Sequence, residues 1–242
     1  MMPEPTVTER VNVIRRRIAE ACHRCGRDPG EITLLGASKS QPLERMQEAW
    51  SAGVRVFGEN RVQEALAKMP NLPGEIDWHL IGPLQTNKVK KVVPRFSTVH
   101  SIDRIKLARA LDKEARKSDR RIDGLLEVNL GAEESKHGFL PDELPGVVEE
   151  LTSLQAVRWI GLMAIPPFES ELEAMRPWFQ RLRQLRDELC PVLGWEGGPG
   201  CLSMGMSLDF EVAIEEGATH VRIGTELFGP REARPRGSAD LG

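Results

Sequence analysis

The chain has 242 residues, 40% of them hydrophobic, and a formal net charge of −3 at pH 7. This length suits one α/β barrel, so we expect one domain over residues 1–229 and a flexible tail over 230–242. The charge gives no support for binding to nucleic acid or a membrane surface. No apolar run approaches the roughly 20 residues of a spanning helix and the N-terminus is polar, so we expect a cytoplasmic protein.

The four cysteines do not have the spacing of a disulfide framework. Cys22 and Cys25 could begin a metal or redox site, but Cys190 and Cys201 lie far away without a matching pair, so we interpret the first two as helix-end residues. The sequence has no tyrosine, which removes one of the usual acid–base side chains from any mechanism.

A helix is expected before the first strand. Thr6 and Glu9 have the spacing of a capping box, and apolar residues then recur on one helical face until Gly26 and Pro29.

The rest of the chain alternates between apolar strand patterns and helical patterns. The expected strands are 32–37, 54–57, 77–82, 98–102, 124–130, 157–165, 201–205 and 219–223. Helical patterns cover 43–50, 62–66, 84–93, 105–111, 144–151, 172–189 and 210–216, with Pro177 in a first turn of the long one. Eight such units predict a single (β/α)8 barrel of the TIM type with an extra N-terminal helix.

The first strand runs without alternation into a Ser-Lys-Ser tip. Such a run is typical of a parallel strand covered on both faces, which places Lys39 at the carboxyl end of the strand. Chemistry in closed parallel barrels is placed at that end, where a lysine among apolar walls can lose its proton and attack a carbonyl. A solvated lysine at a strand end is the alternative.

Two later stretches predict a phosphate site. One runs through Met206 and Ser207 after the seventh strand, and the other runs from Arg222 through Gly224 to Thr225 after the eighth. Amides at helix starts, glycines and hydroxyls can together hold a phosphate dianion, and these two loops are the common phosphate site of this fold. Each glycine could instead serve only a tight turn.

A phosphate site beside a strand-end lysine suggests a phosphorylated aldehyde held as a Schiff base, and pyridoxal 5′-phosphate (PLP) fits that description. The chain resembles the pyridoxal phosphate homeostasis proteins, the alanine-racemase N-terminal-like barrels of PLP fold type III. The matching pieces lie in order between Leu34 and Gly229, and they read LLGASKSQP, FGENRVQEA, WHLIGPLQTNKVK, VHSIDR, EVNLGAEESKHG, GLMAIPP, LSMGMSLDFEVAI and VRIGTELFG.

The resemblance implies a role for several residues. Lys39 would carry the Schiff base, while Ser207, Gly224 and Thr225 would bind the phosphate, with Met206 beside them. Arg222 would approach the pyridine nitrogen. Because arginine does not give up its proton, that nitrogen would stay unprotonated and the cofactor would be a poorer electron sink.

Four further positions are less specific. Asn60 and His79 could face the cofactor ring, although a histidine in an apolar strand is often hydrogen-bonded structure. Lys136 matches a family lysine near the site, or is an exposed loop lysine. The family commonly has a second basic residue where this chain has Gln41.

These features predict a PLP-binding carrier in vitamin B6 homeostasis without efficient turnover. The expected partners are PLP and PLP-requiring apoenzymes, with no nucleic acid or membrane, and the expected state is a monomer. The alternatives are a PLP-dependent racemase or decarboxylase and a Schiff-base aldolase that acts on a sugar phosphate.

Overall fold

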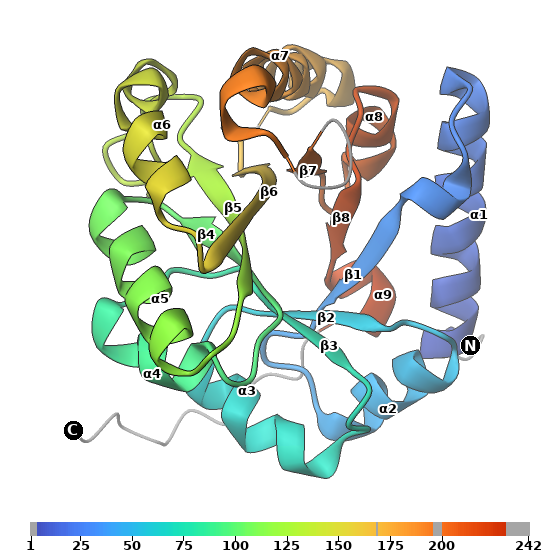
Figure 1. Cartoon of the computed structure of the whole chain (residues 1–242). Helices are drawn as coiled ribbons and strands as arrows, with labels where there is room; N and C mark the ends of the chain where they lie inside the picture. The colour runs from blue at the N-terminus through green and yellow to red at the C-terminus, as the bar shows by residue number, and fades with distance from the viewer. Residues whose placement is uncertain (1–3, 168, 196–199, 231–242) are drawn as a thin grey trace.

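The computed structural model describes residues 4–167, 169–195 and 200–230. Within them, eight parallel strands close into a barrel in the order β1 to β8 (Figure 1). The strands are β1 Thr33–Ala37, β2 Val56–Glu59, β3 Asp77–Leu80, β4 Thr98–Ile102, β5 Ile122–Val128, β6 Val157–Ala164, β7 Cys201–Ser203 and β8 His220–Ile223. The predicted (β/α)8 barrel is confirmed.

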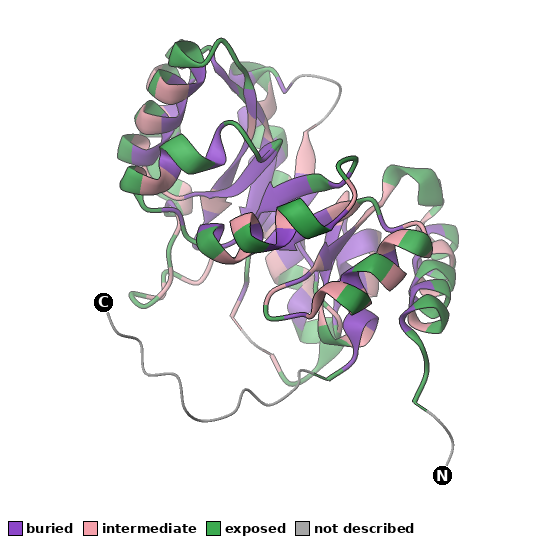
Figure 2. Cartoon of the chain, turned by 90° about the horizontal axis from the view of Figure 1, so that it is seen from below, coloured by how far each residue is buried: buried purple, intermediate pink, exposed green. Residues whose placement is uncertain are grey.

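Helices cover the outside of the barrel, with exposed residues on their outer sides and buried residues toward the strands (Figure 2). The α-helices are α1 Val7–Cys25, α2 Leu43–Ser51, α3 Val62–Lys68, α4 Val89–Val92, α5 Ile105–Lys117, α6 Leu144–Ser153, α7 Arg176–Leu193, α8 Phe210–Glu215 and α9 Thr225–Phe228. Short 3-10 helices lie at Pro29–Glu31, Met69–Asn71, Thr86–Lys88, Pro141–Glu143 and Leu172–Met175. No helix in the described ranges has both the length and the apolar character needed to cross a bilayer.

The N-terminal helix α1 begins at the predicted capping box. The Glu9 amide donates to Thr6 Oγ1 at 3.2 Å and the Thr6 amide donates to Glu9 Oε2 at 2.8 Å. The helix ends at Gly26, whose φ of 70° is a left-handed conformation that glycine adopts without strain. Cys22 and Cys25 lie in its last turn, and no group of side chains in the described part of the chain could hold a metal ion.

Some predicted boundaries differ from the structure for local reasons. The helix expected over 84–93 is a 3-10 turn followed by the one-turn α4, and neither of these two elements has a side-chain cap at its start. The strand expected from Val54 begins at Val56, since the Val54 amide donates to Ala49 O at the end of α2. The short helix α9 confirms that a helix begins directly after the eighth strand. The predicted tail lies outside the described residues apart from Pro230.

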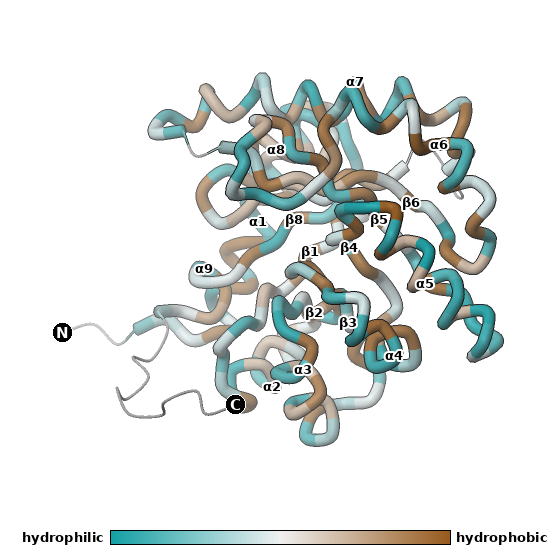
Figure 3. The backbone as a smooth tube through the Cα atoms, turned by 90° about the vertical axis from the view of Figure 1, so that its left-hand side faces the viewer, coloured by the Kyte–Doolittle hydropathy of each residue, from teal (hydrophilic) through white to brown (hydrophobic). Residues whose placement is uncertain are grey.

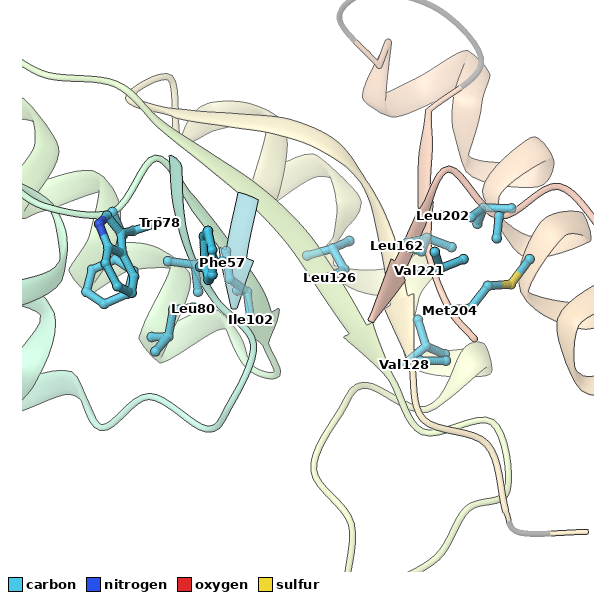
Figure 4. Packing of buried hydrophobic residues seen from close by; sticks show 14 of the residues in the cluster. Phe57, Trp78, Leu80, Ile102, Leu126, Val128, Leu162, Leu202, Met204 and Val221 are labelled. Carbon is cyan, nitrogen blue, oxygen red and sulfur yellow. The ribbon is translucent and has the colours of Figure 1, made fainter. Parts of the chain in front are cut away.

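Outward side chains of the strands pack under the helices. Phe57, which is fully buried, lies 6.2 Å from Trp78 and 6.4 Å from Phe228, measured between ring centroids. Figure 4 shows Phe57, Trp78 and Leu80 together on one side of this core. Both the strands and the helices around them carry hydrophobic stretches (Figure 3).

The inside of the barrel is more polar than its outer layer. Because successive strand residues point to opposite faces, His79 between Trp78 and Leu80 faces inward. The same alternation turns Arg222 of β8 and Glu127 of β5 into the barrel. These inward polar residues lead to the carboxyl end of the strands.

Candidate functional site

Three loops that follow adjacent strands meet at the carboxyl end of the barrel. Strand β8 pairs with β1, with Leu35 opposite Arg222 and Gly36 opposite Ile223, and β7 pairs with β8. The turn with Lys39 after β1 therefore lies beside the loops after β7 and β8. Lys39 is half-buried, and its amine has no hydrogen bond or ion pair with any residue that the structure describes. The predicted position of this lysine is confirmed.

A buried ion pair lies directly under the turn that carries Lys39. Lys68 Nζ, at the end of α3, donates to Glu59 Oε1, at the end of β2, over 2.7 Å. Glu59 is fully buried, and burial raises the pKa of its carboxyl, while the Lys68 ammonium opposes that shift. Sequence reasoning missed this pair, although its members are close in the chain, because whether Lys68 reaches back to Glu59 depends on how α3 packs against the barrel.

The loop after β7 is held by Asp209. Its Oδ1 accepts a hydrogen bond of 2.6 Å from the Met206 amide, so this amide is engaged within the loop, and a place for Met206 beside the cofactor stays a prediction. Gly205 has a φ of 89°, and a Cβ there would lie 2.6 Å from Ala213 Cβ, so this glycine is required by the turn itself. The hydroxyl of Ser207 has no partner among the described residues.

The loop after β8 leaves several donors unpaired. Thr225 is exposed, and neither its hydroxyl nor the amides of Thr225 and Glu226 meet an acceptor in the described part of the chain. A Cβ at Gly224 would lie 3.5 Å from Ala37 O, an ordinary contact, so the space beside Gly224 is open. The open space and the free donors fit an oxyanion that approaches the backbone.

Arg222 crosses the barrel interior between these loops. Its guanidinium donates to Ser203 O at 2.6 Å, to Ser203 Oγ at 2.7 Å and to Ala164 O at 2.9 Å. Burial lowers the pKa of Arg222 to about 10, while Asp209 and Glu127 oppose that shift. The side chain therefore stays positively charged at neutral pH. Its Nε has no partner among the described residues.

A chain of hydrogen bonds inside the barrel connects Arg222, through Ser203 and two histidines, to Asp77. His100 Nδ1 lies 2.9 Å from Ser203 Oγ, His100 Nε2 lies 2.8 Å from His79 Nδ1, and His79 Nε2 lies 3.2 Å from Asp77 Oδ2. Arginine only donates and an ionised carboxylate only accepts, so with neutral imidazoles every proton in the chain is directed from Arg222 toward Asp77. Both nitrogens of His79 are thus occupied, which leaves none for a cofactor and favours the structural interpretation of this residue.

Burial keeps two histidines inside the barrel, His100 and His220, neutral. It moves the pKa of His100 well below its ordinary value, with the neighbouring His79, His220 and Arg222 acting in the same direction. The same cause lowers the pKa of His220 to about 3. Of the two rings in the hydrogen-bonded chain, His100 is therefore neutral at physiological pH, as the proton direction requires.

Three other predicted positions lie around the rim with different surroundings. Asn60 follows β2, and its backbone O would lie 2.5 Å from a Cβ at Gly82, so its main chain is closely packed. Lys136 forms an ion pair of 2.5 Å with Glu133 and donates to Pro166 O at 3.1 Å, so its amine, unlike that of Lys39, is engaged. Gln41 is buried, and its Oε1 has no partner among the described residues.

Comparisons with known proteins agree with this architecture. The family model for the alanine racemase N-terminal domain matches residues 37–232. The pyridoxal phosphate homeostasis protein of Aquifex aeolicus is 48% identical over 225 residues, which are 93% of this chain and 98% of that protein. PipY of Synechococcus elongatus PCC7942, solved with PLP bound, is 37% identical with a TM-score of 0.80, covering 93% of this chain and 100% of PipY.

A more distant solved structure shares the fold alone. The alanine racemase of Streptomyces lavendulae is 16% identical with a TM-score of 0.65, and the match covers 89% of this chain but 56% of the racemase. Because the family model spans most of the sequence and a relative is 48% identical along nearly all of both chains, this chain belongs to the alanine racemase N-terminal domain family, among its pyridoxal phosphate homeostasis proteins.

Proposed function

We propose that this chain binds pyridoxal 5′-phosphate and acts in its homeostasis, holding the cofactor covalently and reversibly on Lys39. Relatives of 48% and 43% identity are named pyridoxal phosphate homeostasis proteins, and PipY was solved with the cofactor. The cofactor supplies an aldehyde, whose carbon joins a neutral primary amine with loss of water to give a Schiff base.

The observation that carries the proposal is the position of one free amine beside free phosphate donors. Lys39 has no partner among the described residues and lies at the same barrel end as the unpaired hydroxyls of Ser207 and Thr225. In this arrangement the two loops bind the phosphate, Gly224 admits it to the backbone, and Lys39 takes the aldehyde. In this proposal, the positively charged guanidinium of Arg222 faces the pyridine nitrogen of the cofactor.

The role is that of a carrier without efficient turnover, since the names of the relatives describe homeostasis and not a reaction. PLP-requiring apoenzymes are the receivers that such a carrier implies. Their identity, a monomeric state and a cytoplasmic location remain predictions from the sequence.

The test is to trap the cofactor on the purified protein with borohydride and map the modified peptide by mass spectrometry. We expect a yellow protein whose visible band disappears on reduction, with the added mass on Lys39. Lys39→Ala should lose the band while circular dichroism shows an intact fold, and Lys136→Ala, which removes an amine that is already paired, should keep it.

Two results would contradict the proposal. Modification of Lys136 in place of Lys39 would transfer the covalent site to the loop after β5. A colourless protein that is trapped instead with a sugar phosphate would support the aldolase alternative.

A further inference from the structure

The turn around Lys39 is held on both sides by a group of charged residues that we name the tip clamp, composed of Glu59, Glu64 and Lys68. On one side, Ser38 Oγ donates to Glu59 Oε1 over 2.7 Å and Ser38 O accepts from Lys68 Nζ over 2.8 Å. On the other side, the amide of Ser40 donates to Glu64 Oε1 over 2.5 Å.

Lys68 joins the two sides into one unit. Its ammonium donates to Glu59 Oε1 and to Glu64 Oε1, each over 2.7 Å, in addition to Ser38 O. All three protons of the ammonium are therefore directed either at the turn or at a carboxylate that itself binds the turn. Lys68 is 8% exposed and Glu59 is fully buried, so water screens these contacts weakly.

The backbone held by the clamp is one that needs external support. Ser40 has a φ of 59°, an uncommon left-handed conformation for a residue with a side chain. The Gln41 amide closes the turn on Ser38 O over 3.0 Å, the same oxygen that Lys68 binds. Charge-assisted hydrogen bonds at both flanks of Lys39 thus fix where its Cα lies and which way its side chain leaves the turn.

We propose that Lys68, acting through Glu59 and Glu64, is a positioning residue for Lys39. The tip clamp does not contact the amine of Lys39, which must stay free to react. It restricts the backbone of the turn, so the amine approaches the aldehyde carbon from one direction. Covalent bond formation requires the reacting atoms to be aligned at close approach, so a loosened turn slows this step. This inference rests on the proposed function.

The clamp is separable from binding of the rest of the cofactor. The phosphate donors at Ser207 and Thr225 belong to other loops, and none of the contacts of Glu59, Glu64 or Lys68 described above reaches those loops. A change in the clamp should therefore affect the rate of covalent attachment and leave the affinity for the phosphorylated ring unaltered. A residue that merely stabilised the fold would change both.

The experiment measures these two quantities on cofactor-free full-length protein. The rate of attachment is followed by absorbance after mixing with PLP, and the dissociation constant is measured for 4′-deoxypyridoxine 5′-phosphate, which has the ring and phosphate but no aldehyde. The main variant is the double substitution Glu59→Gln with Lys68→Met, which avoids leaving one buried charge alone. We expect attachment to slow by about 10–100-fold while the analogue binds within about twofold of wild type.

Further variants separate positioning from folding. Lys68→Arg keeps the charge and should retain most of the wild-type rate of attachment. The single change Glu64→Gln, on a partly exposed side chain, should slow attachment by a smaller factor than the double substitution does. Asp112→Asn is the matched control. Asp112 is a buried carboxylate that also binds one cation, Arg116, and one amide, Ala156, but it does so at the amino-terminal end of β6, so its loss should not change the rate.

The outcomes distinguish the two proposals. Attachment at the wild-type rate in the double variant and in Glu64→Gln, or a parallel loss of analogue affinity, would overturn the clamp as a positioning device. Absence of an adduct on Lys39 in the wild-type protein would overturn the proposed function and the inference with it.

Discussion

At the scale of single residues, we predict that the hydroxyls of Ser207 and Thr225 at the carboxyl end of the barrel contribute to phosphate affinity. Ser207→Ala and Thr225→Val should each weaken cofactor binding by about 1–3 kcal/mol, the range for hydrogen bonds to a charged group. Equilibrium titration with the aldehyde-free analogue checks this without the covalent step. Ser51→Ala on α2, which removes only a hydrogen bond to Gln47 O in the same helix, is the control. Equal affinities in all three variants would place the phosphate elsewhere.

Glu127 predicts a dependence of stability on pH. Burial, aided by Asp103, raises the pKa of its carboxyl from 4.5 to about 7, and Arg222 only partly opposes this. The folded protein therefore binds a proton that the unfolded chain has lost, and stability falls as pH rises from about 4.5 through 7. Glu127→Gln should remove this fall, worth about 1–3 kcal/mol between pH 5 and 8.

Urea unfolding of the cofactor-free protein at pH 5 and pH 8 measures the effect of Glu127. The exposed loop residue Glu134 provides the control substitution, Glu134→Gln, which should keep the wild-type pH dependence. An unchanged pH dependence in Glu127→Gln would mean that this carboxyl is already ionised in the folded protein at neutral pH.

At the scale of elements, Phe57 joins β2 to β3 and α9. It is fully buried between Trp78 and Phe228, so Phe57→Ala removes a large side chain from a place with little room to collapse. We expect a loss of about 3–5 kcal/mol in the free energy of unfolding, measured in urea. Leu208→Ala, at a side chain that is 69% exposed, should change it by less than about 0.5 kcal/mol. Similar values for the two variants would contradict the packing described for this core.

The N-terminal helix contacts both helices that follow the proposed phosphate loops. Arg17 of α1 forms ion pairs with Glu211 of α8 and Glu226 of α9. Its guanidinium also lies 4.6 Å from the ring centroid of Phe210. The extra helix thus fixes both loop helices against the barrel, which gives a physical reason for its presence beside β8 and β1.

At the scale of the whole molecule, we predict that the protein is not an efficient racemase although it shares the racemase barrel fold. Racemisation needs one base on each face of the bound amino acid, and Lys39 can serve only one of them. The sequence contains no tyrosine to serve the other. With Arg222 facing the pyridine nitrogen as proposed, its positive charge would further weaken the cofactor as an electron sink.

Incubation of the loaded protein with L-alanine in deuterated water tests this prediction. Exchange of the α-proton reports carbanion formation even where no inversion occurs, so it is more sensitive than a change in optical rotation. We expect only slow exchange. Turnover on the order of 1 s⁻¹ or faster, in the usual range of enzymes, would favour the racemase alternative.

The sequence by itself determined the barrel and the position of Lys39 after its first strand. Apolar periodicity is local, and so is the order of strand, loop and helix, which is why Lys39 and the loops at Ser207 and Thr225 could be assigned to one end before any contact was known. The boundary errors at 54–57 and 84–93 came from short elements. The cofactor roles of these residues stay predictions.

Only the tertiary structure decided which polar groups are free and which are engaged. The Met206 amide is bound by Asp209, His79 is bound at both nitrogens, and the amine of Lys136 is paired, whereas that of Lys39 is not. The contact between Lys68 and Ser38 likewise joins residues that are 30 positions apart. Such pairings depend on strand register and on how each helix packs on the closed barrel, and local sequence patterns carry no information about either.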